Sequence, residues 1–310
     1  MQTKATFSDY FQLHFIVLIW GFTAILGKLM QPLDSSAVVL FRTILAVLGM
    51  GAVLIARRQS FQVPPTDRWR LLATGGLIAL HWMTFFLAAR IANVSVCLAG
   101  LATSSLWASV LEPLLLRRRV RPIEVILGGV VLAGLYLIFR FEFDKVVGLA
   151  MAVFSAMLSS LFTIINSRFT RRYDALLISF YEMAGASVGA LAMWLLVWLL
   201  DPLRTSHPER YVPNTPMQWL WLLILSLVCT VYAYSVGVRL LRKFSPYMAI
   251  LTVNLEPVYG IVLAVLIFGD AERMTSGFYV GTLVILAAVL VYPFWNSRLT
   301  KAEARLPTST

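Results

Sequence analysis

Residues Phe22-Thr23-Ala24-Ile25-Leu26-Gly27-Lys28 are matched about 140 positions later by Phe162-Thr163-Ile164-Ile165-Asn166-Ser167-Arg168. About the same spacing separates Leu40-Phe41-Arg42 from Phe180-Tyr181-Glu182. Self-similarity at a fixed offset indicates that a structural unit has been duplicated. The matches therefore predict that this chain contains the same unit twice.

The offset between the two copies grows along the chain. Trp69 corresponds to Trp219 at an offset of 150, and Gly129 corresponds to Gly281 at an offset of 152. The additional residues fall mainly in the proline-rich loop 201–216. Duplication followed by growth of one loop explains this drift.

The composition places both copies in a membrane. The 310 residues are 59% hydrophobic and 13% charged, with a mean hydropathy of +0.80, whereas about 25% of the residues in a soluble domain are charged. A helix needs about 20 apolar residues to span a bilayer. We expect ten spans, at 11–30, 35–56, 69–89, 93–116, 122–140, 146–167, 174–200, 217–240, 244–268 and 274–295.

Ten spans divide into two units of five. Because five is odd, the second unit enters the bilayer from the opposite side, and inverted repeats of this kind are typical of alternating-access transporters. The sequence therefore predicts an all-α polytopic membrane protein whose ten transmembrane helices form two inverted five-helix repeats. The first repeat is expected over 1–140, the second over 141–300, and a cytoplasmic tail over 301–310.

The net charge of +11 does not indicate a nucleic-acid partner, because the basic residues alternate between loops. One set of loops and termini holds 18 of the 26 lysines and arginines, the other set holds 7, and Arg42 lies inside a span. Because basic loops stay in the cytoplasm, we expect a multi-pass protein of the cell inner membrane with both termini cytoplasmic. The first apolar stretch lacks a small-residue cleavage site, so we expect it to remain as a helix.

Small residues recur four positions apart in three expected spans. This spacing lets helix backbones approach closely, either within one chain or between two copies through spans five and ten, so a monomer and a homodimer both remain open. Cys97 and Cys229 fall inside spans and are interpreted as packing residues rather than a disulfide or metal site. The small-residue pairs are Gly129 with Ala133, Gly185 with Gly189, and Gly277 with Gly281.

Four ionisable residues lie deep inside expected spans, where each costs roughly 2.5–3.5 kcal/mol on insertion scales. Arg42 and Glu182 occupy matching positions of the two copies and carry opposite charges. His81 lies near the middle of span three and Glu256 near the middle of span nine. Arg42, Glu182 and Glu256 are candidates for coupling or intramembrane charge, with structural ion pairing as the alternative.

Glu256 is followed by Pro257, which breaks the helix and frees backbone carbonyls that transporters use to line cavities. The Glu256 carboxylate either takes up a proton or caps the broken helix. Glu112 lies closer to the cytoplasmic interface and is expected to pair with the arginines that follow it.

Aromatic residues near these polar groups can form a stacking wall for an organic substrate, although most aromatic residues in a bundle are packing residues or belong to the interfacial belt. The candidates for a substrate-binding cavity wall are Trp20, His81, Trp82, Trp107, Tyr232, Asn254 and Glu256.

The sequence has no phosphate-binding glycine loop and no His/Cys/Asp cluster at metal-ligand spacing. We therefore expect no enzyme activity, no cofactor and no metal. The alternative from another class is a membrane-embedded enzyme or lipid-handling protein, with His81 and the glutamates as acid and base.

The pattern resembles the EamA-type transporters of the drug/metabolite transporter superfamily over essentially the whole chain. The resemblance rests on Trp20-Gly21-Phe22-Thr23 through Lys28, Phe41-Arg42, Asn254-Leu255-Glu256-Pro257-Val258, Phe268-Gly269 with Glu272, and Gly281. In the first half Thr103-Ser104-Ser105 stands where a proline is usual, so the sequence predicts no proline break in span four.

The resemblance implies a substrate held centrally between the halves, with walls from spans one, three, four, six, eight and nine. We expect a transporter of small organic metabolites that exports amino acids or related aromatic metabolites by alternating access. The alternative within transport is import or exchange of a nucleoside, vitamin or sugar derivative. The expected partners are the small-molecule substrate and the lipid bilayer.

Overall fold

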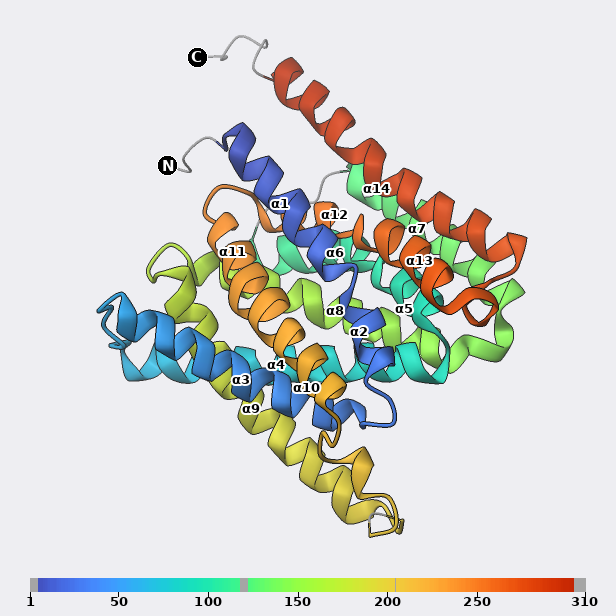
Figure 1. The fold of residues 1–310 in the computed structure, drawn as a ribbon. Coiled ribbons are helices and arrows are strands. Elements are labelled where there is room, and N and C mark those ends of the chain that lie inside the picture. Colours follow the sequence, from blue (N-terminus) through green and yellow to red (C-terminus); the bar gives the residue numbers. More distant parts are fainter. Residues whose placement is uncertain (1–4, 118–121, 204, 304–310) are drawn as a thin grey trace.

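The computed structural model describes residues 5–117, 122–203 and 205–303, and the regular elements within those ranges are all helical. Figure 1 shows these helices packed against one another as one bundle. Some residues of the charge count and the end of the expected tail lie outside the described residues: Lys4, Arg118, Arg119, Arg121, Arg204, Arg305 and 304–310.

The first half of the chain forms seven helices. They are α1 (Phe7–Trp20), α2 (Thr23–Leu29), α3 (Ser35–Ala56), α4 (Pro65–Ile91), α5 (Val94–Leu101), α6 (Ser104–Leu116) and α7 (Pro122–Phe141).

The 3-10 turn Phe143–Lys145 leads into the second half, which also contains short 3-10 turns at Pro208–Arg210 and Gly269–Glu272. Its longer elements are α8 (Val146–Phe169), α9 (Ala175–Leu200), α10 (Pro216–Leu223), the π-helical segment η3 (Ile224–Tyr232), α11 (Ala233–Leu240), α12 (Pro246–Val253), α13 (Glu256–Phe268) and α14 (Ser276–Glu303).

Eight helical stretches of the described chain are long and apolar enough to cross a membrane. They are Phe7–Leu29, Ser35–Ala56, Pro65–Ile91, Val94–Leu116, Phe143–Phe169, Ala175–Leu200, Pro216–Leu240 and Pro246–Glu272. Ile126–Phe141 of α7 and Ser276–Ala288 of α14 are apolar but shorter. The prediction of an all-helical polytopic membrane protein is confirmed, while the total of ten spans stays a prediction.

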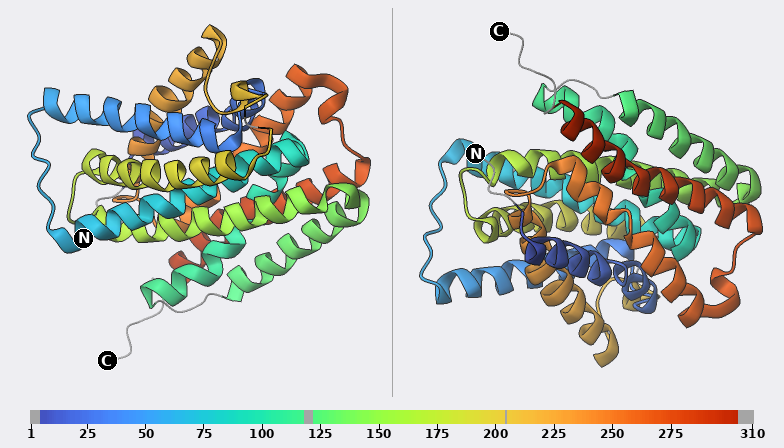
Figure 2. Two further views of the ribbon diagram at one scale, coloured as in Figure 1. Left: turned by 90° about the horizontal axis from the view of Figure 1, so that it is seen from below. Right: turned by 90° about the horizontal axis from the view of Figure 1, so that it is seen from above.

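The loops gather at two opposite ends of the bundle. At one end Lys243 pairs with Asp9 at 2.8 Å, and at the other Lys28 pairs with Glu272 at 2.8 Å. We call these the Asp9 end and the Glu272 end. In both views of Figure 2 the connections after α3 and α8 lie at the Asp9 end, and those after α7 and α13 at the Glu272 end.

Glycines allow two pairs of helices to touch backbone to backbone. A Cβ atom on Gly75 of α4 would overlap the Glu182 carbonyl of α9, and one on Gly185 would overlap the backbone of α4. Gly134 of α7 and Gly281 of α14 each face the carbonyl oxygen of the other, and α7 and α14 lie side by side in Figure 1. Gly185 of span seven and Gly277 and Gly281 of span ten therefore serve packing within one chain, whereas a Cβ on Gly129 of span five would meet nothing within 4 Å. A homodimer stays a prediction.

Three of the eight spanning stretches are interrupted near their middle. The interruptions fall between α1 and α2, between α5 and α6, and between α12 and α13. Pro257 was expected to break the third of these stretches, and it lies in the first turn of α13. The break between α5 and α6 occurs without a proline, so the absence of proline there does not keep this helix continuous.

Serine and threonine hydroxyls stabilise the break between α5 and α6. The Thr103 hydroxyl donates to the Gly100 carbonyl at 2.8 Å, and the Ser104 hydroxyl donates to the Leu101 carbonyl at 2.7 Å. The Ser104 hydroxyl thereby replaces the backbone donor that the interrupted helix no longer supplies to Leu101, while the Gly100 carbonyl also accepts from the Thr103 N–H at 3.1 Å.

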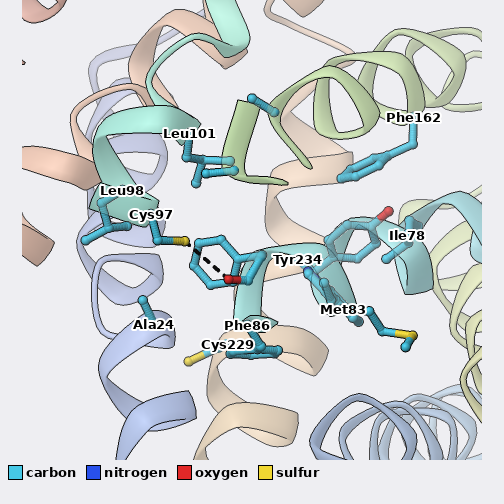
Figure 3. Close-up of a cluster of buried hydrophobic side chains, with 14 of the residues drawn as sticks. Ala24, Ile78, Met83, Phe86, Cys97, Leu98, Leu101, Phe162, Cys229 and Tyr234 are labelled. Atoms are coloured by element: carbon cyan, nitrogen blue, oxygen red, sulfur yellow. Dashed lines mark hydrogen bonds between the residues drawn. The ribbon is translucent and has the colours of Figure 1, made fainter. Parts of the chain in front are cut away.

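The two cysteines are buried and free. The Cys97 thiol donates to the Phe85 carbonyl at 3.2 Å, as the dashed line in Figure 3 marks. Both residues belong to the large hydrophobic core, together with Phe86, Phe162 and Tyr234. The interpretation of the cysteines as packing residues fits these positions.

Candidate functional site

A cavity of about 110 Å³ lies among the broken helices. Its wall is formed by side chains from both halves of the chain, on α1 to α6, α8 and α11 to α13. Leu13 of α1, Asn166 of α8 and Leu241 after α11 extend the wall toward the Asp9 end. The space is larger than one water molecule requires.

The Glu272 end is closed by a buried polar cluster. The side chain of Glu272 is fully buried and accepts hydrogen bonds from the backbone N–H groups of Val94 and Ser95, at 3.0 and 2.9 Å. It also pairs with Lys28. The carboxylate thereby caps the first turn of α5, where the helix dipole favours negative charge. These contacts join the end of α13 to α2 and α5.

Arg42 of α3 is 2% exposed and held in a fixed orientation. Its Nε donates to the Thr230 hydroxyl at 2.8 Å, and its Cζ lies 3.6 Å from the centre of the Trp82 ring. The Thr230 hydroxyl in turn donates to the Leu225 carbonyl of η3 at 2.9 Å. Stacking and the Nε bond together position the plane of the guanidinium group in the cavity wall.

Glu256 of α13 also lines the cavity. Among the described residues its carboxylate has no hydrogen-bond or ion-pair partner. The carboxylate oxygens are nevertheless not fully buried, so they are exposed to the cavity. Glu256 is the first residue of α13, where the helix dipole stabilises an anion.

His81 of α4 lines the cavity with one ring nitrogen already committed. Its Nδ1 lies 2.9 Å from the Ser155 carbonyl, and the Ser155 hydroxyl donates to the His81 carbonyl at 2.8 Å. The Ser155 hydroxyl also lies 2.7 Å from Nδ1, so both oxygen atoms of Ser155 hold this side of the ring. With Nδ1 held by Ser155, Nε2 is the ring nitrogen that remains for the cavity.

Glu182 of α9 lies behind the wall and is fully buried. Its Oε2 accepts from the Tyr234 hydroxyl at 2.8 Å and from the Asn166 amide at 3.2 Å. Asn166 and Tyr234 line the cavity, but Glu182 does not. Oε1 of Glu182 and Oδ1 of Asn166 have no partner among the described residues.

The structure brings four of the seven predicted wall residues to the cavity, namely Trp20, His81, Trp82 and Glu256, and it adds Arg42. The other three, Trp107, Tyr232 and Asn254, lie elsewhere. Tyr232 is 45% exposed and its ring contacts Phe15. It ends the π-helical segment, whose wider turns place side chains out of register with an α-helix, so Tyr234 faces the cavity instead.

The side chains of Trp107 and Asn254 both pack inside the bundle rather than line the cavity. Trp107 of α6 lies against the hydrophobic core, and its indole N–H has no partner among the described residues. Asn254 is 1% exposed at the break between α12 and α13, with neither of its amide atoms hydrogen-bonded in the described chain.

Sequence reasoning missed Asn166, Phe162 and Tyr234 as wall residues. Asn166 stands at the position where the first copy has Leu26, and a polar residue that replaces an apolar one between copies would have identified it. No comparable signal distinguishes Phe162 from Phe22, its equally aromatic counterpart, which is 38% exposed.

A model of the EamA-like transporter family matches residues 10–140 and again residues 146–292. The chain belongs to the EamA-like transporter family. It is therefore a membrane transporter of the drug/metabolite transporter superfamily. No curated protein matches the sequence.

The EamA-like fold is also found among solved structures, 29 chains of which match. One crystal structure of a protein superposes with a TM-score of 0.68 over 92% of this chain and 96% of that chain, at 17% sequence identity. At this identity the similarity shows the fold alone.

One sequence pattern in this EamA-like transporter imitates a hydrolase motif. Residues 185–189 match Gly-x-Ser-x-Gly, but they lie inside α9, and the Ser187 hydroxyl donates to the Met183 carbonyl at 2.8 Å. A nucleophile elbow requires a sharp strand-to-helix turn that exposes the serine. The pattern is therefore helical packing, and within the described residues no three His, Cys, Asp or Glu side chains cluster as metal ligands.

Proposed function

We propose that this EamA-like transporter is an inner-membrane protein that exports amino acids or related aromatic metabolites by alternating access. One observation carries the proposal. The cavity lies where three helices are broken, both halves of the chain line it, and its wall combines charged groups with aromatic rings. Broken helices around a central site are how transporters expose backbone and charge to a substrate.

The proposal includes two inverted five-helix repeats, at 1–140 and 141–300, with a short cytoplasmic tail. Similar contacts made by an arginine of each half, at opposite ends of the bundle, support it. Arg90 donates to the Gly27 carbonyl at 3.3 Å at the Glu272 end, and Arg242 donates to the Thr170 carbonyl at 2.8 Å at the Asp9 end. The Arg90 bond joins the end of α4 to the end of α2, in the first spanning stretch of the first half. The Arg242 bond joins the end of α11 to the end of α8, the first helix of the second half.

The caps of the broken helices correspond in the same way. Glu272, after α13, accepts from the first turn of α5. Glu112, in α6, accepts from the N–H of Tyr247 in the first turn of α12 at 3.0 Å. Each broken helix thus caps the start of the other, at opposite ends of the bundle.

In an alternating-access cycle this conformation corresponds to the inward-facing state. The cavity extends toward the Asp9 end, and the Lys28–Glu272 cluster closes the opposite end. The basic loops put the Asp9 end in the cytoplasm, so the cavity faces inward in this state. Outward release then requires Lys28 and Glu272 to separate and the helices at the Asp9 end to close over the cavity.

Proton coupling is part of the proposal, with Glu182 and Glu256 as the candidate carriers and Arg42 of α3 as a further intramembrane charge. Both carboxylates lack a cationic partner within hydrogen-bonding distance in the described chain. Glu182→Gln and Glu256→Gln should abolish flux driven by a pH gradient. Gradient-driven flux that persists in both variants would exclude these carriers.

The test of function is flux in proteoliposomes loaded with radiolabelled amino acids, amines, organic acids and nucleosides. We expect saturable flux of amino acids or aromatic metabolites. The absence of saturable flux for every class would overturn the proposal, and flux of nucleosides alone would favour the importer or exchanger alternative.

Topology can be tested with the same chain because both native cysteines are buried. Ser60→Cys lies in the exposed loop after α3 at the Asp9 end, and Ser206→Cys lies in the exposed loop after α9 at the Glu272 end. In intact cells an impermeant maleimide should label only Ser206→Cys. Labelling of Ser60→Cys alone would reverse the proposed orientation.

A further inference from the structure

The cavity presents two opposite charges that do not neutralise each other. Arg42 and Glu256 both line it, from α3 and from the start of α13. Among the described residues they form no ion pair with each other or with a third group. Charges removed from water are strongly unfavourable unless they are paired, so the arrangement is complementary to a ligand that supplies both opposite charges.

The positive side of the cavity is preorganised for a carboxylate. The Nε bond to Thr230 and the stacking on Trp82 use one edge and one face of the Arg42 guanidinium group. The two Nη groups have no hydrogen-bond partner in the described chain. They are not fully buried, so they remain accessible from the cavity. A fixed guanidinium edge binds a carboxylate through two parallel N–H···O bonds.

The negative side of the cavity offers acceptors for an ammonium group. Glu256 directs its carboxylate into the cavity from the start of α13. Pro257 has no N–H with which to bond the carbonyl of Val253, four residues earlier, and Val253 is itself a wall residue. A carboxylate and a freed carbonyl suit an ammonium group, which only donates.

The rest of the wall suits an apolar or aromatic side chain. Phe162 of α8 and Tyr234 of α11 have ring centres 6.4 Å apart and ring planes inclined by 54°, and Figure 3 shows the two side chains as neighbours. Tyr234 also meets Trp82 edge to face at 6.3 Å. Phe85 and Trp20 complete this aromatic surface, on which an aromatic ring can pack.

We propose that the cavity recognises a free α-amino acid as a zwitterion, its carboxylate at Arg42 and its ammonium at Glu256, with an apolar or aromatic side chain against Phe162 and Tyr234. The proposal rests on the proposed function, since it takes this cavity as the substrate site. It goes further in requiring both charges on one ligand. Amines without a carboxylate and acids without an amine are then excluded.

Three ligands of one size test this requirement: phenylalanine, phenethylamine, which lacks the carboxylate, and 3-phenylpropionate, which lacks the amine. Binding is measured as thermal stabilisation of the purified full-length protein, and transport as flux in proteoliposomes. For the wild type we expect phenylalanine to be preferred over each analogue by at least about tenfold, because a site built for a polar group rejects ligands that lack it.

Charge-removing variants then assign each end of the ligand. Arg42→Gln should lose the preference for phenylalanine over phenethylamine but keep that over 3-phenylpropionate, and Glu256→Gln should do the reverse. Arg42→Lys keeps the charge but not the paired donors, so its preference should be intermediate. Arg57→Gln and Asp270→Asn, at exposed loop positions, are the matched controls and should behave as the wild type.

The ratios separate recognition from folding, because a misfolded variant weakens all three ligands equally. A wild type that accepts phenethylamine or 3-phenylpropionate as well as phenylalanine overturns the zwitterion proposal while leaving transport intact. Unchanged ratios in both charge-removing variants also overturn it. No binding and no flux for any ligand class would instead overturn the proposed function itself.

Discussion

The break between α5 and α6 and the break between α12 and α13 lie on the same cavity, but they satisfy their backbone groups differently. At the first, the hydroxyls of Thr103 and Ser104 donate to carbonyls of α5. At the second, Pro257 supplies no donor, and the amide of Asn254 is buried without a partner in the described chain. Glu256 beside it opens onto the cavity.

This difference indicates that the break between α5 and α6 is structural, whereas the break between α12 and α13 binds the ligand. Hydroxyl groups that bond their own helix leave little polar capacity for a substrate. Unsatisfied acceptors next to a cavity are unfavourable in the empty protein and favourable when a donor arrives. We therefore infer that duplication supplied two breaks of similar geometry, and that the second one carries substrate recognition.

The largest expected effect concerns the cap that holds the first break in place. Glu272→Gln removes the anion that pairs with Lys28 and accepts from the first turn of α5. Breaking a buried pair usually costs about 3–5 kcal/mol, and Lys28 is partly exposed, so we expect a loss of about 3 kcal/mol in the free energy of unfolding. Chemical denaturation in detergent measures it.

Asp270→Asn is the control for Glu272→Gln. Asp270 lies in the same turn and pairs with Arg273, but its side chain is 86% exposed, so its ion pair contributes at most about 1 kcal/mol. Equal losses in the two variants would show that the cap does not fix α5.

The second substitution, Pro257→Ala, makes the break between α12 and α13 resemble the break between α5 and α6, which has no proline. Pro257→Ala restores an N–H that can bond the Val253 carbonyl, which removes an acceptor from the cavity wall. Since Pro257 occupies the first turn of α13, where proline is well tolerated, we expect a change of less than about 1 kcal/mol in stability. Transport should nevertheless fall by roughly tenfold, as expected for a lost hydrogen bond to a charged group.

Pro113→Ala is the matched control on the other broken helix. Pro113 lies inside α6, away from the cavity wall. We expect its transport rate to equal that of the wild type. A tenfold loss in both variants would mean that proline affects the rocking of the helices rather than the ligand site.

The comparison also shows what the sequence could and could not predict. The duplication, the apolar spans and the proline beside Glu256 predicted a membrane bundle with a polar break in span nine, because periodicity and proline act locally. The break at Ala102 was not predicted. Thr103 and Ser104 bond carbonyls of their own helix, and in the sequence such residues look the same as any other threonine or serine.

The same limit applies to the candidate site. Arg42, His81 and Glu256 could be identified because charge inside a span is costly wherever it points. Tyr232 and Tyr234 could not be separated, because the π-helical segment Ile224–Tyr232 shifts the register, and sequence patterns assume the α-helical period. Trp107 shows the same difficulty, since an aromatic residue near a break suits either a wall or a core.

The third prediction tests the hydroxyl caps of the first break. Ser104→Ala leaves the Leu101 carbonyl of α5 without its hydroxyl donor, at an expected cost of about 1 kcal/mol in stability. Thr103→Ala should cost less, because the Gly100 carbonyl still accepts from the Thr103 backbone N–H at 3.1 Å. Ser109→Ala is the control, because Ser109 bonds the Leu106 carbonyl inside continuous α6, where the backbone also supplies a donor. Transport selectivity should not change in any of the three, and altered selectivity in Ser104→Ala would assign the first break to the ligand site as well.

The smallest expected effect comes from the loop after α9, which touches neither break. The hydroxyl of Tyr211 donates to Asp201, the N–H of Leu203 also bonds it, and Arg210 pairs with it at 2.9 Å; these contacts hold the pKa of the Asp201 carboxyl below its ordinary value.

A carboxyl whose pKa is lower in the folded state stabilises the protein above its unfolded pKa, and this contribution disappears as the pH falls through the folded pKa. Between about pH 6 and pH 3 we therefore expect the wild-type melting temperature to fall slightly more than that of Asp201→Asn. Parallel curves would show that this loop contributes no pH dependence. Because the loop is remote from both breaks, the preference for phenylalanine over its analogues at pH 7 should be the same in both proteins, and a change in that ratio would mean that the Glu272 end is coupled to the ligand site.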